Sequence, residues 1–130
     1  MLSLFFLFQD IMSDEEQKEY CLVGLEECIY YTEDEIDLDY SYNIRNKDEI
    51  EELSWALFAY KELYSQLENS ELPFYEDVIG CFQSDMLEYS RRNKNTSRMF
   101  MCMFNTISTF LEYIYVIIDS EIEYRKEKAC

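Results

Sequence analysis

Hydrophobic side chains recur at three- and four-residue steps along most of this chain, the spacing that places them on one face of a helix. Ser13 followed by Glu16 has the spacing of a capping box. A first helix is therefore predicted to begin there and to end near Tyr31. Its apolar stripe comprises Cys21, Leu22, Leu25, Cys28 and Ile29.

Three further helices are predicted downstream. Asn46 and Glu49 repeat the capping spacing before a second apolar stripe. Pro73 suits the first turn of a third helix, because its missing N–H group would have no partner there anyway. A fourth helix is expected from Met99 to Ile118, and it should be the innermost because no charge interrupts it before Glu112. The second stripe consists of Leu53, Leu57, Tyr60, Tyr64 and Leu67.

Residues 36–44 break the helical spacing, since every second residue is apolar. Such a two-residue period is typical of a strand with one buried face. No other segment alternates as well, so we expect an exposed strand edge that pairs with a partner or with a second copy of the chain. The predicted fold class is mainly α, a small helical bundle of about four principal helices with one extended or β segment near residues 36–44. The alternating apolar residues are Ile36, Leu38, Tyr40, Tyr42 and Ile44.

Length and composition favour one domain over residues 1–130. An apolar content of 48% is enough for a core, and two glycines and one proline are too few for the turns of a β-sandwich. Residues 1–12 form an apolar N-terminal extension that is too short to cross a bilayer. We expect it to dock on the body or to be dispensable, with membrane attachment as the alternative.

The residue types present exclude several kinds of catalytic site. The chain has no histidine, which removes the usual nucleophile activation and the histidine-bearing metal sites. Its glycines, Gly24 and Gly80, are too far apart for a phosphate-binding loop. Five cysteines without paired spacing favour a reduced, cytoplasmic setting. We therefore predict no enzyme, no cofactor and no metal site.

Acidic residues and tyrosines are interleaved in the first third of the chain. Residues 10–40 hold twelve of the 28 carboxylates and one base, Lys18, which is a local charge of −11 out of −17. Carboxylates attract basic surfaces, and tyrosine supplies rigid contact area. A face that only keeps the protein soluble is the alternative. The predicted partner-binding residues are Glu26, Glu27, Tyr30, Tyr31, Glu33, Asp34, Glu35, Asp37, Asp39, Tyr40 and Tyr42.

These features favour an acidic inhibitory binding protein of the immunity or antitoxin type. Its expected partner is a basic toxin or nuclease domain, with no direct nucleic-acid binding and no membrane, and a homodimer is left open. One alternative is a DNA mimic that blocks a DNA-binding protein. Another is a modulator of host apoptosis or signalling similar to the viral Bcl-2-like helical bundles, although the Asn-Trp-Gly-Arg signature of that family is missing around Trp55.

Overall fold

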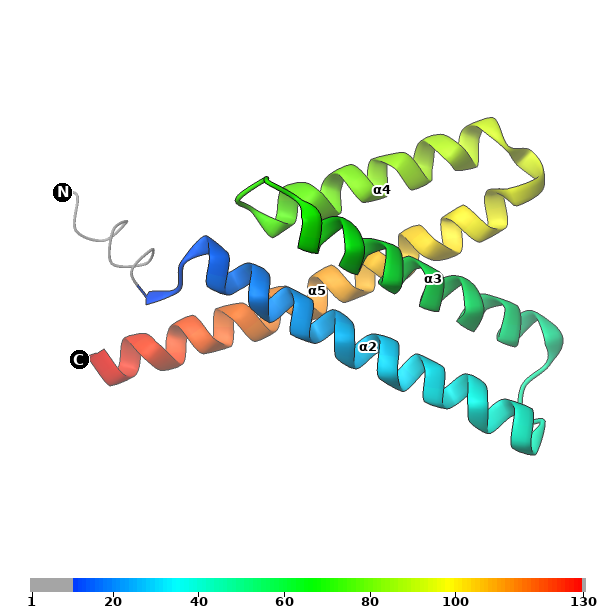
Figure 1. Cartoon of the computed structure of the whole chain (residues 1–130), viewed down its shortest axis with the longest axis horizontal. Helices are drawn as coiled ribbons and strands as arrows, with labels where there is room; N and C mark the ends of the chain where they lie inside the picture. Colours follow the sequence, from blue (N-terminus) through cyan, green and yellow to red (C-terminus); the bar gives the residue numbers. More distant parts are fainter. Residues whose placement is uncertain (1–10, 130) are drawn as a thin grey trace.

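The computed structural model describes residues 11–129, and these form a bundle of four long α helices. Helices α2 and α3 lie side by side, and α4 pairs with the first half of α5 (Figure 1). The two pairs spread apart toward the end of the bundle that carries the α2–α3 and α4–α5 turns. The predicted helical bundle is confirmed. The helices are α2 (Asp14–Tyr42), α3 (Lys47–Asn69), α4 (Tyr75–Arg92) and α5 (Ser97–Ala129), with a short 3-10 turn η1 (Lys94–Thr96) before α5.

Both predicted capping signals start a helix. The Ser13 hydroxyl accepts a hydrogen bond from the Glu16 amide at 3.1 Å, and the Asn46 side chain accepts one from the Glu49 amide at 2.9 Å. These bonds satisfy backbone donors that have no partner within the helix. Pro73 lies two residues before α4 instead of in its first turn. The apolar extension predicted for residues 1–12 falls almost wholly outside the described residues.

The strand predicted for residues 36–44 is wrong, because α2 runs past Tyr31 as far as Tyr42. No strand occurs anywhere in residues 11–129. Leu38, Tyr40 and Ile44 are exposed, so the alternating apolar residues do not form a buried face. A helix pairs its own backbone groups, whereas a lone strand in this chain would leave them without partners.

A buried carboxylate shapes the turn after α2. Asn43 takes the left-handed conformation, with φ 52° and ψ 49°, and its amide donates to the Asp39 carbonyl at 2.7 Å. Asn tolerates this conformation better than most residues do. Asp39 is only 3% exposed, and its side chain accepts a hydrogen bond from the Arg45 amide at 2.6 Å. Together these bonds end α2 and turn the chain toward α3.

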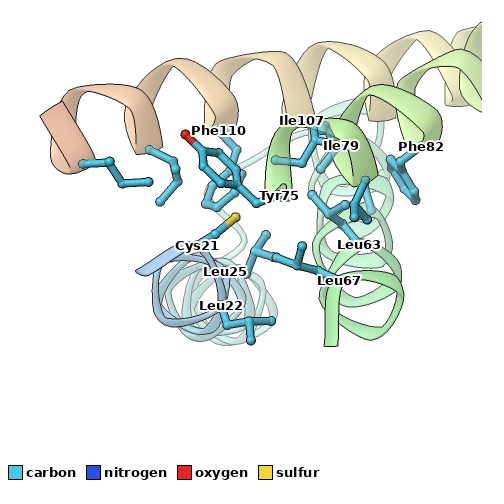
Figure 2. Close-up of a cluster of buried hydrophobic side chains, with 14 of the residues drawn as sticks. Cys21, Leu22, Leu25, Leu63, Leu67, Tyr75, Ile79, Phe82, Ile107 and Phe110 are labelled. Carbon is cyan, nitrogen blue, oxygen red and sulfur yellow. The ribbon is translucent and has the colours of Figure 1, made fainter. Parts of the chain in front are cut away.

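The core lies where all four helices meet (Figure 2). Cys21 and Leu25 of α2, Leu63 of α3, Ile79 of α4 and Ile107 of α5 are completely buried. Helix α5 contacts the other three helices, and its buried stripe follows the predicted helical spacing. That stripe consists of Met103, Ile107, Phe110, Ile114 and Ile118.

Much of α5 nevertheless faces outward. The helical stretch Lys94–Lys128 is long and apolar enough to cross a membrane by length and composition alone, and 28% of its most apolar window is buried. Thr109, Tyr113 and Val116 are exposed along one side. Helix α5 thus contributes side chains both to the core and to the exposed surface.

Helices α2 and α5 are in close contact at Gly24. A Cβ atom added there would lie 2.7 Å from Ile114 Cδ1 and 3.3 Å from Phe110 Cε2. Both of these side chains are buried, so they have little room to move aside. The absence of a side chain at Gly24 therefore permits this crossing. Gly80 on α4 is exposed and has no atom within 4 Å of such a Cβ.

The two glycines should respond oppositely to alanine. Gly80→Ala should raise the free energy of unfolding by about 0.5–1 kcal/mol, because alanine is the better helix former and nothing opposes its methyl group. Gly24→Ala should lower it by about 1 kcal/mol, since overpacking outweighs the gain in helix propensity. Urea denaturation of both variants measures the difference. Equal stabilisation by the two substitutions would contradict the close crossing.

Ile107 should be among the most sensitive core positions. It is completely buried where α5 meets its neighbours, so Ile107→Ala should cost about 2–5 kcal/mol of unfolding free energy. Leu111, one turn away, is only partly buried, and Leu111→Ala should cost less. Chemical denaturation of the two variants gives the comparison, and a near-neutral effect at Ile107 would refute this description of the core.

Candidate functional site: the acidic half of α2 and the trough beside it

Four of the predicted binding residues are tyrosines that stand out from α2. Tyr30 and Tyr31 are 66% and 64% exposed, and Tyr40 and Tyr42 are 80% and 71% exposed. The rings of Tyr30 and Tyr31 meet edge to face, with centroids 5.6 Å apart. Because they project from a regular helix, these rings lose little conformational freedom on contact with a partner.

Three of the predicted carboxylates already have partners. They brace the second half of α2 against α3 and against the turn between the helices. Exposed ion pairs of this kind contribute little stability each, about 0–1 kcal/mol, so their main effect is to orient the helix. The Tyr64 hydroxyl donates to Glu26 at 2.9 Å, Lys61 Nζ lies 3.0 Å from Glu33, and Arg45 lies 3.5 Å from Glu35.

Other predicted carboxylates remain available. Asp34 and Asp37 are exposed and make no hydrogen bond or ion pair with any described residue. Glu27 is also exposed and borders a surface hollow. Asp39 is different, because its buried carboxylate holds the Arg45 amide. Asp39 therefore belongs to the turn and is left out of the proposed binding surface.

Helical spacing places several of these exposed residues in one stripe along α2. Glu27, Tyr31, Asp34 and Leu38 follow one another at steps of three and four, which places them in one stripe. Glu27 and Tyr31 line a hollow whose other walls come from α3 and α5. The stripe therefore runs from this hollow toward the C-terminal end of α2, which leads into the turn to α3. Tyr30 lies to one side of it.

The hollow beside Glu27 and Tyr31 has a volume of about 310 Å³. Its remaining lining is Cys28 from α2, Tyr60 from α3, and Thr109, Phe110 and Tyr113 from α5. A second hollow of about 480 Å³ lies between α3 and α5, and Thr109 lines both. We call the two hollows together the trough. The second hollow is lined by Glu52, Arg98, Met101, Cys102, Asn105, Thr106 and Thr109.

Arg98 is the basic residue that lines the trough, and neighbouring groups hold it in place. Its guanidinium contacts Glu51 at 3.2 Å and Glu52 at 3.1 Å, and it lies 4.9 Å from the centre of the Trp55 ring. These carboxylates raise the pKa of Arg98, so its charge is permanent and locally compensated. The trough therefore presents no free positive charge at this end.

Two weakly polar groups help to line the smaller hollow. Burial and the neighbouring Cys28 raise the pKa of Tyr60 to about 12, and burial also raises the pKa of the Cys28 thiol. Both groups are therefore neutral at physiological pH. A neutral hydroxyl and a neutral thiol beside Phe110 make a surface that suits an apolar side chain better than an ion.

Sequence reasoning did not identify the trough residues of α3 and α5. Tyr60 was assigned to the core stripe of its helix, and Thr109 and Tyr113 carried no signal of their own. Their position beside Tyr31 depends on how the three helices are arranged in space. The run without charged residues that begins at Met99 was the one sequence signal for these α5 residues, because it contains more uncharged residues than a single buried stripe needs.

The part of the chain that the structure describes contains no group of three His, Cys, Asp or Glu side chains able to hold a metal ion. Cys21 is completely buried, and its pKa is raised to about 12 by burial, so it acts as a small apolar core residue. The arrangement offers recognition chemistry: exposed rings, unpaired carboxylates and a trough whose smaller hollow is mainly apolar.

Comparison with protein families, with curated proteins and with solved structures finds no significant match.

Tyr60 should make the protein sensitive to alkaline pH. Its pKa is about 12 in the folded chain against about 10 in an unfolded one, so its contribution to stability is complete below pH 10 and is lost as pH rises toward 12. Tyr60→Phe should reduce this alkaline loss. Tyr40→Phe, which alters an exposed ring, is the matched control. Urea midpoints at pH 8, 10 and 11.5 in reducing buffer measure the effect, and parallel curves for the wild type and Tyr60→Phe would contradict it.

Proposed function

We propose that this protein is an acidic inhibitory binding protein of the immunity or antitoxin type, which covers a basic surface of a toxin or nuclease domain in the cytoplasm. The observation that supports the proposal comes from the acidic C-terminal half of α2, which holds most of the predicted binding residues. There, exposed tyrosines stand beside carboxylates that have no partner among the described residues. Tyrosine is enriched among the residues that dominate interface energies, and unpaired carboxylates are ready to meet Lys or Arg.

Rigidity adds to this support. The face projects from an uninterrupted helix that α3 braces through Lys61 and Tyr64. A partner would therefore meet side chains that are largely preorganised, so little ordering entropy is lost on binding. A helix segment that serves only solubility needs charge, but it has no need for four exposed tyrosine rings.

Charge should govern the rate of encounter. A net charge of −17 attracts basic proteins and repels nucleic acid over about 8–10 Å at physiological salt. Such steering speeds association more than it strengthens the final complex. It also suits an inhibitor, which has to reach its target before that target acts.

The test is capture of the partner followed by inhibition. The immobilised full chain should retain a basic protein whose enzymatic or toxic activity falls when the chain is added. The double variant Asp34→Asn, Asp37→Asn should associate with that partner at least about threefold more slowly, because it lacks two unpaired carboxylates. Stopped-flow or surface-plasmon measurements at low and high salt give the rates.

The matched control removes the same charge elsewhere. Glu62→Gln with Glu71→Gln alters two exposed carboxylates outside the face, and it should slow association less. Equal slowing by both double variants, or an on-rate unaffected by salt, would contradict a specific face. Binding to many DNA-binding proteins would favour the DNA mimic instead. Binding to a pro-apoptotic helical peptide, without a basic protein partner, would favour the viral modulator.

A further inference from the structure

Resting on the proposed function, we propose that the trough between α5 and the α2–α3 pair receives a basic amphipathic helix of the partner. In this arrangement the apolar ridge of the partner helix lies in the trough, and its Lys and Arg residues face the carboxylates of α2. The trough thereby adds the partner's contacting element and its chemistry to what the acidic residues of α2 alone suggest.

The dimensions of the trough fit one helix. Along α5 its lining residues run from Arg98 to Tyr113, which is about 22 Å at 1.5 Å per residue. A partner helix of about four turns has the same length. Helices bound in grooves typically insert side chains spaced at i, i+3 or i+4, and i+7. Two hollows that meet at Thr109 provide places for such successive anchors.

The smaller hollow of the trough is suited to an apolar anchor. Phe110, Tyr60 and Tyr113 surround the smaller hollow, and Met101 lines the larger one. Of the other groups that line this hollow, Tyr60 and Cys28 are neutral at physiological pH, and Glu27 is the one ion. The larger hollow adds Asn105, Thr106 and the paired Glu52 and Arg98, whose side chains suit the polar flank of a helix.

The charges around the trough select a basic occupant. Glu27 lies on its edge, and Asp34 continues the same stripe of α2. Arg98 is compensated by Glu51 and Glu52, so it does not offer a free cation to an acidic helix. A helix with Lys or Arg beside its apolar ridge would therefore gain attraction along α2, whereas an acidic helix would be repelled.

Two designed peptides test the proposal against the full chain. The first is a 14-residue helix with leucines at groove spacing and lysines elsewhere, and the second replaces its leucines with glutamine. Fluorescence anisotropy should show the leucine peptide binding at least tenfold more tightly than the glutamine peptide. Equal affinities would overturn the trough while leaving attraction by the acidic face intact. No binding by either peptide would also overturn it, and the capture experiment would still judge the proposed function.

A charged substitution in the trough distinguishes binding within the trough from general attraction of the peptide by negative charge. Thr109 is exposed, and its hydroxyl bonds only to the Asn105 carbonyl, so Thr109→Glu should fold normally. The new carboxylate attracts a basic peptide but fills the trough, and we expect at least fivefold weaker binding of the leucine peptide. Ser65→Glu places the same charge on an exposed position of α3 and should change binding less than twofold. Equal effects of the two variants would overturn the proposal.

Native cysteines report where the peptide lies. Cys28 and Cys102 line the two hollows, whereas Cys81 is exposed on α4 outside them. Saturating leucine peptide should slow alkylation of Cys28 and Cys102 at least threefold, as measured by mass spectrometry, and should leave Cys81 unchanged. Protection of Cys81 to the same degree, or of none of the three, would overturn the proposal. If concentrated protein alone protects Cys28, a second copy of the chain occupies the trough. That result would overturn the proposal as well.

Discussion

The close crossing of α2 and α5 at Gly24 is the constraint on which the rest of the structure depends. Phe110 and Ile114 occupy the space that a larger side chain at this position would need. The two helices meet closely here and separate beyond the crossing, because a straight helix cannot follow another at a large angle for more than a few turns. The core therefore forms around the crossing, and the outer half of α2 is left with α3 as its main support.

This divergence creates the surface on which the proposals rest. If α2 followed α5 closely, Tyr31 and Thr109 would be buried against each other. Instead they line an open trough, and the carboxylates farther along α2 stay in water. Ion pairs to α3 and the buried Asp39 at the turn keep the projecting helix regular. The molecule thus combines a well-packed core with an exposed acidic surface on the C-terminal half of α2.

Much of the helical fold could be predicted from local patterns. Ser13 and Asn46 cap their helices as expected, because a capping bond involves residues only three positions apart. The stripe that includes Ile107 and Phe110 is buried as its spacing indicated. Residues 36–44 were predicted wrongly because their apolar residues alternate by type without being buried. Asp39, a polar residue of that pattern, is the one residue of 36–44 that is buried.

The sequence by itself determined the capped helix starts, the buried stripes of α2 and α5 and the acidic, tyrosine-rich composition of α2, since each depends on neighbouring residues or on charge alone. The buried side of α3 was not determined in this way, because Ala59 and Leu63 are buried there while Leu53 and Leu57 of the predicted stripe are only partly buried. Only the tertiary structure decided which carboxylates of α2 are already paired and which remain available. It also decided that Tyr60 and Thr109 share a surface with Tyr31, although they lie on three different helices. Such assignments depend on crossing angles and on the space available at Gly24, and a periodic pattern carries information about one helix at a time.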